Sequence, residues 1–302
     1  LSALKSSEPD SQTINNKYSI DLKALATLTA LKSLNLRDNN LKHGQVCETI
    51  ISLENLEHLD LSLSDRKLFM QRELELNEAT FMRITKLRVL NLSGNQIKLE
   101  GNCFRYLTQL KELDLSHTVL DSDNEDLEIF SCLKQLEKFK FSNIEPCDLF
   151  KLYRLSELVN LRELTLNEIT HHDLDQFREM LRRKRRRTGE IEEPNVHQTF
   201  DDLCQFILRN MTKLTRLELT QCQLTYINTN FFSKMKDLTH LILNGNQIEY
   251  IPDDTFDCLT NLEEIFLQDD ELEQLKLNRL FLNCDKLRKV TFNHAAVVDL
   301  WD

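Results

Sequence analysis

Apolar positions recur along the chain in a fixed pattern that reads Leu-x-x-Leu-x-Leu-x-x-Asn-x-Leu. The clearest copy contains Leu87, Leu90, Leu92, Asn95 and Ile97. Ten copies can be aligned, and their first residues are Leu31, Leu56, Leu87, Leu110, Leu136, Leu161, Leu214, Leu238, Leu262 and Leu287. Most starts lie 23 to 26 residues apart, with steps of 31 residues after Leu56 and 53 residues after Leu161. A period of this size predicts a solenoid.

Each copy contains a short segment in which apolar and polar residues alternate. Between Leu87 and Leu92, for example, Leu90 and Leu92 fall on one side and Val89 and Asn91 on the other, which is typical of a half-buried strand. Such strands, stacked in parallel about 4.8 Å apart, satisfy one another's backbone groups and align their leucines in one core. We therefore predict an α/β solenoid with about ten parallel strands.

The ninth position of the pattern lies where the chain leaves the strand. Asn39, Asn95 and Asn246 occupy it in three copies, and a side-chain amide there can bond to backbone groups at the bend. Ile144 and Ile169 occupy it in the fifth and sixth copies and cannot form such bonds. The sequence therefore predicts an interruption of the asparagine ladder just before the long 53-residue step.

Phenylalanines recur at a second fixed position, six residues before the next strand motif. These are Phe81, Phe104, Phe130, Phe232, Phe256 and Phe281. Because all six share one offset, we expect their rings to stack from repeat to repeat on the convex side of the solenoid.

The strand motif and the phenylalanine positions together resemble the leucine-rich repeat proteins, most closely the "typical" subtype of about 24 residues per repeat. Residues 238–259 follow the order of that subtype, and the resemblance covers about residues 22–300. It implies a curved horseshoe whose strands line a concave, partner-binding face. The subtype is common in animal extracellular proteins such as Toll-like receptors and small proteoglycans.

The order of segments predicts a polar lead-in at residues 1–17 and a solenoid over 18–302, interrupted by a helical, basic insertion at about 170–213. A helix starting at Thr199 should bury Leu203, Phe206 and Ile207. The insertion also contains an unbroken basic run, Arg182, Arg183, Lys184, Arg185, Arg186 and Arg187. This run is either a solvated helix end, where cations suit the helix dipole, or a second contact for an acidic partner, nucleic acid, import or processing factor.

Composition narrows the class of function. The net charge of −11 argues against a nucleic-acid-binding protein, and no apolar run approaches the roughly 20 residues of a membrane helix. Five glycines cannot supply a phosphate-binding loop, and no G-x-S-x-G, H-E-x-x-H or paired-cysteine motif occurs. We therefore expect no catalytic residue, no metal site and no cofactor.

The eight cysteines are scattered through the repeats, as expected of buried free thiols rather than a disulfide framework. This spacing slightly favours an intracellular protein, and a secreted protein or extracellular ectodomain is the alternative.

Strand residues at the third and fifth positions of each motif should line the concave face. Most are polar, but Ile242 and Phe266 share one position in adjacent repeats. Exposed apolar neighbours inside a polar rim are typical of an interface centre. The alternatives are that an overlying loop covers Phe266 or that Phe266 is an isolated surface aromatic. The predicted partner site consists of Arg216, Glu218, His240, Ile242, Glu264, Phe266, Lys289 and Thr291.

The sequence thus predicts a non-catalytic scaffold that binds a partner protein on its concave face. Two alternatives stay open. One is the substrate-recognition arm of a larger enzyme, such as a ubiquitin-ligase receptor or a bacterial effector. The other is a secreted or cell-surface receptor ectodomain of Toll-like type. The identity of the partner and the oligomeric state do not follow from the sequence.

Overall fold

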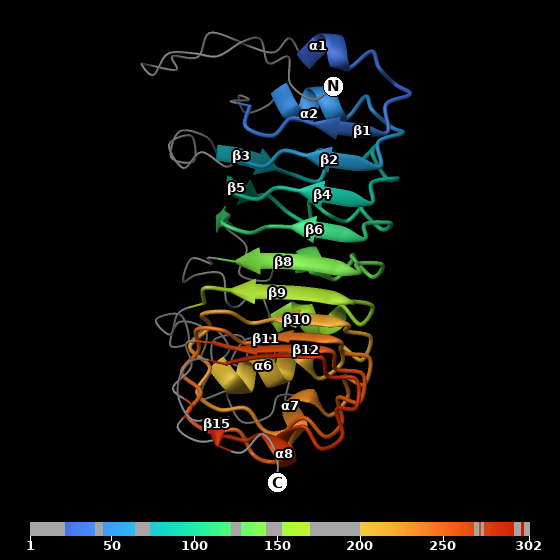
Figure 1. The fold of residues 1–302 in the computed structure, drawn as a ribbon. Helices are drawn as coiled ribbons and strands as arrows, with labels where there is room; N and C mark the ends of the chain where they lie inside the picture. The colour runs from blue at the N-terminus through green and yellow to red at the C-terminus, as the bar shows by residue number, and fades with distance from the viewer. Residues whose placement is uncertain are drawn as a thin grey trace, which may run out of the picture. The chain divides into compact units, whose positions relative to one another are not determined.

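A computed structural model describes residues 22–39, 45–63, 73–121, 128–142, 153–169, 200–268, 272, 275–292 and 297–298. The chain divides into two compact units, residues 1–136 and 137–302. Figure 1 labels most of the helices and strands named below. The lead-in at 1–17, the basic run at 182–187 and the rest of the predicted insertion up to residue 199 lie outside the described residues. The predicted domain boundaries therefore stay predictions.

The first unit contains four strands of the main sheet, in the order β1 (Ser33–Asn35), β2 (His58–Asp60), β4 (Val89–Asn91) and β6 (Glu112–Asp114). Each pairs in parallel with the next. A second parallel sheet follows the bends and contains β3 (Glu73–Leu76), β5 (Gln96–Leu99) and β7 (Val119–Asp121). The helical turns of this unit are α1 (Leu22–Leu25), α2 (Gln45–Ile50) and η1 (Glu128–Phe130).

The second unit contains six strands of the main sheet, in the order β8 (Lys138–Ser142), β9 (Glu163–Asn167), β10 (Arg216–Glu218), β11 (His240–Ile242), β12 (Glu264–Leu267) and β14 (Lys289–Phe292). All of these pairs are parallel. The helices are η3 (Tyr153–Glu157), α6 (Phe200–Leu208), α7 (Thr229–Phe232) and α8 (Leu277–Leu280). A small parallel sheet pairs β13 (Leu275–Lys276) with β15 (Val297–Val298).

All ten strands of the main sheet lie in the alternating segments, as predicted, and each begins at the third position of the repeated motif. The fourth position points into the core: Leu90 and Leu113 of the first unit and Leu241 of the second are each no more than 1% exposed. The predicted fold class, an α/β solenoid of parallel strands, is therefore confirmed.

Phenylalanine rings stack behind the sheet in both units. The ring centroids of Phe81 and Phe104 are 5.9 Å apart, and those of Phe232 and Phe256 are 5.7 Å apart. The rings of Phe256 and Phe281 lie 5.6 Å apart and almost parallel. The predicted aromatic stack is therefore present in each unit.

Helix α6 lies near the end of the 53-residue interval between the motifs that start at Leu161 and Leu214. It begins at Phe200, close to the predicted start. Phe206 and Ile207 are buried, as predicted, and the side chain of Leu203 lies outside the described residues. The Asp201 carboxylate accepts hydrogen bonds from the backbone and hydroxyl of Thr225, at 3.1 and 2.9 Å. These bonds attach the helix to the repeat that follows it.

Candidate partner-binding face

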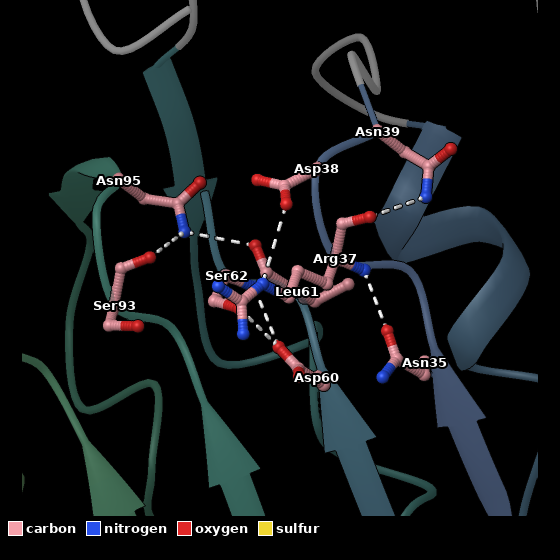
Figure 2. A network of polar contacts seen from close by, with 9 residues as sticks. All are labelled: Asn35, Arg37, Asp38, Asn39, Asp60, Leu61, Ser62, Ser93 and Asn95. Carbon is pink, nitrogen blue, oxygen red and sulfur yellow. Dashed lines mark hydrogen bonds and ion pairs between the residues drawn. The ribbon is translucent and has the colours of Figure 1, made fainter. Parts of the chain in front are cut away.

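The bends after the strands determine which side chains remain available on the sheet surface. In the first unit the fifth position is always Asn or Asp: Asn35, Asp60, Asn91 and Asp114. Each side chain accepts a hydrogen bond from the backbone N–H two residues later, at 2.9 to 3.0 Å. Figure 2 shows the first of these bonds, from Arg37 N–H to Asn35, and its counterpart from Ser62 N–H to Asp60. The fifth-position side chains of the first unit therefore stabilise the bends that follow the strands.

The ninth-position asparagines form the predicted ladder. The Asn95 amide donates to the carbonyls of Leu61, in the previous repeat, and of Leu92 (3.0 and 2.8 Å; Figure 2 draws the first). Asn246 donates in the same way to Leu219 (2.8 Å), and its oxygen accepts from the N–H groups of Cys222 and Leu224. The Asn39 amide donates to the Arg37 carbonyl of its own bend at 3.0 Å.

The ladder is interrupted in the sixth copy, where buried Ile169 supplies no polar group. A cysteine restores the link in the seventh copy. The Cys222 thiol donates to the Leu166 carbonyl of the previous repeat at 3.0 Å, the bond that Asn246 makes to Leu219. Burial raises the pKa of this thiol to about 12, which keeps it protonated and able to donate. Ile144 lies outside the described residues.

The other described cysteines are also buried or half-buried, and none of the described six forms a disulfide. Burial raises the pKa of Cys284 to about 11 and also raises that of Cys103. These thiols therefore fill space in the core, as the sequence predicts for small apolar residues.

In the second unit the fifth position no longer holds Asn or Asp. It reads Lys140, Thr165, Glu218, Ile242, Phe266 and Thr291 along adjacent strands. The third position reads Lys138, Glu163, Arg216, His240, Glu264 and Lys289. All eight residues of the predicted partner site therefore lie together in two parallel rows on one sheet face of this unit. We call this surface the β8–β14 face.

Ile242 and Phe266 are direct cross-strand neighbours on this face, and both side chains are half-buried. The ammonium group of Lys289 lies 4.6 Å from the centroid of the Phe266 ring. A cation over an aromatic face is attracted to the ring, by about 0.5–1 kcal/mol at an exposed site. The apolar pair is thus bordered by a cationic side chain from the next strand.

Polar residues around the apolar pair are oriented by their own neighbours. Arg216 lies 3.2 Å from Glu218 on the same strand, and the hydroxyl of Thr239 lies 2.8 Å from Nδ1 of His240. Glu264 lies 3.5 Å from the guanidinium of Arg288. This arrangement, a small apolar centre inside a charged rim, suits recognition of a folded or extended protein segment.

The described residues contain no group of three or more His, Cys, Asp or Glu side chains that could hold a metal ion. No described helix is long and apolar enough to cross a membrane.

A leucine rich repeat family model matches residues 73–120 and 212–272. The chain contains leucine-rich repeats in these two segments. The family assignment agrees with the parallel strands and asparagine bends of both units.

Curated relatives match only part of this leucine-rich repeat chain. Transforming growth factor beta activator LRRC33 of Danio rerio is 30% identical over 121 residues, which is 40% of this chain and 15% of that protein. Receptor like protein 23 of Arabidopsis thaliana is 33% identical over 41% of this chain and 13% of its own length. Human lumican is 29% identical over 53% of this chain and 52% of its own length. The chain thus spans about half or less of these relatives.

Solved structures are also similar to the leucine-rich repeat chain. Internalin C2 of Listeria monocytogenes has a TM-score of 0.49 at 17% identity and covers 90% of both chains. TLR13 in complex with ssRNA13 has a TM-score of 0.46 at 20% identity, over 91% of this chain and 38% of that chain.

Proposed function

We propose that this protein is a non-catalytic recognition scaffold that binds a partner protein on the β8–β14 face. The observation that carries the proposal is the pair Ile242 and Phe266. The two side chains are cross-strand neighbours and partly exposed, and the surrounding residues of the face are polar or charged. Aromatic residues at the centre of an interface commonly supply much of its binding free energy.

A protein partner fits the charge better than nucleic acid does, because the chain has a net charge of −11. Acidic side chains Glu163, Glu218 and Glu264 alternate with basic ones along the face, and a polyanion would be repelled by them. The ring stack behind the sheet supports the assignment to the "typical" leucine-rich repeat subtype.

A receptor ectodomain is the second candidate. Two curated relatives carry names that describe a receptor-like protein and an activator of a growth factor. The complete reading frame distinguishes the two candidates, because an ectodomain requires a membrane-spanning segment beyond these residues.

Removal of the Phe266 ring should weaken partner binding without unfolding the chain. Phe266→Ala is expected to cost roughly 1–3 kcal/mol of binding free energy, because a half-exposed aromatic contributes more to an interface than to the fold. The measurement is affinity capture with mass spectrometry, followed by titration of the captured partner. The melting temperatures of wild type and Phe266→Ala are measured alongside and should be equal.

Tyr250→Ala is the matched control, since Tyr250 is an aromatic of the same unit, 57% exposed and outside the β8–β14 face. Equal affinity of the partner for wild type and Phe266→Ala would remove the proposed centre of the site.

A further inference from the structure

A hollow of about 230 Å³ lies on the β8–β14 face, next to the apolar pair. It spans strands β8, β9 and β10. Its lining residues are Lys138, Phe139, Lys140, Glu163, Thr165, Arg216 and Glu218. Three of these side chains are cationic and two are anionic, so the hollow carries a formal charge of +1 on a chain that is acidic overall.

Both carboxylates of the hollow are already engaged. Glu163 lies 3.1 Å from the ammonium of Lys138, with 37% of its side chain exposed. One oxygen of Glu218 lies 3.2 Å from Arg216, and the other accepts a hydrogen bond from Asn167 at 2.9 Å. The negative charge of the hollow is therefore largely compensated within it.

Lys140 is the remaining cation. Within the part of the chain that the structure describes, it is the lining cation that has neither a hydrogen bond nor an ion pair. Its cross-strand neighbour is Thr165, whose hydroxyl can donate a hydrogen bond. An ammonium and a hydroxyl side by side in a partly enclosed hollow suit one carboxylate.

We propose that this hollow binds an Asp or Glu side chain of the same partner segment that contacts Ile242 and Phe266. This inference rests on the proposed function, because it places both subsites on one bound segment. A basic partner side chain is disfavoured, since the two carboxylates that would receive it are paired and Lys140 would repel it.

The spacing of the strands determines the spacing of the partner residues. Thr165, Glu218, Ile242 and Phe266 occupy one row on consecutive strands. At about 4.8 Å per strand, Ile242 and Phe266 lie roughly 10 and 14 Å from Thr165. An extended segment advances about 3.3 Å per residue, so the acidic and the large apolar residue of the partner should be three or four positions apart.

Selection from a displayed library of random twelve-residue peptides tests the inference on the full chain. We expect enriched peptides to carry Asp or Glu three or four positions from Phe, Trp, Leu or Ile. Lys140→Glu should weaken the selected peptides about tenfold or more, and their affinity should fall as salt rises. Selection on Lys140→Glu itself should enrich Lys or Arg in place of Asp or Glu.

Lys234→Glu is the matched control, because it makes the same charge change at an exposed lysine outside the β8–β14 face. Its peptide affinities should equal those of wild type. Lys140 is also exposed, so we expect all three proteins to have the same melting temperature.

The outcomes separate the two proposals. The inference is overturned if the selected peptides bind Lys140→Glu as tightly as wild type, or if they lack an acidic residue. In that case, weaker binding of the same peptides to Phe266→Ala would still support the proposed function. Peptides unaffected by Phe266→Ala overturn the proposed function and the inference with it. A selection that enriches basic peptides, or no common sequence, also overturns the inference.

Discussion

Gly94→Ala is expected to destabilise the first unit by about 3–5 kcal/mol. Gly94 has a φ of +72°, and a Cβ there would lie 1.9 Å from the backbone oxygen of Leu63 in the previous repeat. The clash is with backbone, so a side-chain rotation cannot relieve it, and the left-handed conformation adds about 1–2 kcal/mol for any residue with a Cβ. Denaturant titration by circular dichroism measures the loss. Hydrogen exchange should show the fastest opening around β2 and β4.

Gly101→Ala is the matched control in the same unit. Gly101 has a similar φ of +65°, but the nearest atom to a Cβ is in the Glu78 side chain at 3.5 Å, an ordinary contact. It should therefore lose only the roughly 1–2 kcal/mol of backbone strain. Equal losses for the two variants would contradict the close packing of the bends.

Asn246→Ala should destabilise the second unit by about 2–4 kcal/mol. The substitution removes a buried amide that donates to Leu219 and accepts from Cys222 and Leu224. Because the side chain is only 3% exposed, water cannot replace these bonds without opening the bend. The measurement is the midpoint of denaturant unfolding, with hydrogen exchange of the amides of Cys222 and Leu224 as the local reporter.

Asn261→Ala makes the same change at an amide that also links two repeats. Its side chain donates to the Lys236 carbonyl at 2.9 Å and accepts from Lys286 at 2.7 Å, both at exposed positions. Water can take over these bonds, so a loss of at most about 1 kcal/mol is expected. Equal unfolding midpoints for Asn246→Ala and Asn261→Ala would contradict the stabilising role of the asparagine ladder.

The strands could be predicted from the sequence because one alternating motif recurs. In the first unit, for example, the copy at Leu87 correctly predicted a strand between Leu87 and Leu92 in which Leu90 is buried. Asn95 and Asn246 were equally clear, since each occupies the same position after a strand. One copy of the motif alone is a weak indication of a strand. Ten copies together are reliable, because a misaligned copy would disagree with the other nine.

The eighth position of the motif was missed. It adopts a positive φ in six copies: Asp38, Gly94, His117, Glu168, Gln221 and Gly245. The glycines were a signal, but Glu168 and Gln221 have no intrinsic preference for this conformation. Hydrogen bonds to the next repeat force it there, as from the Gln221 N–H to the Asn244 carbonyl at 2.9 Å. Such long-range constraints are not visible in a single repeat.

The rows of the candidate site followed from the motif, but their chemistry did not. The sequence placed Lys140 and Thr165 on the exposed face without indicating a hollow between them. Their significance depends on the pairing of Glu163 with Lys138 and of Glu218 with Arg216. The sequence does not show which charged side chains of the face are paired with one another, because several lie within reach of each.

Photo-crosslinking tests most directly whether the β8–β14 face binds the partner. A benzophenone amino acid is placed at position 242, 140 or 250 of the full chain, and the chain is irradiated with the captured partner. We expect crosslinks from positions 242 and 140 to one short partner segment and none from position 250. Crosslinks from position 250 alone, with none from 242, would contradict partner binding on the β8–β14 face.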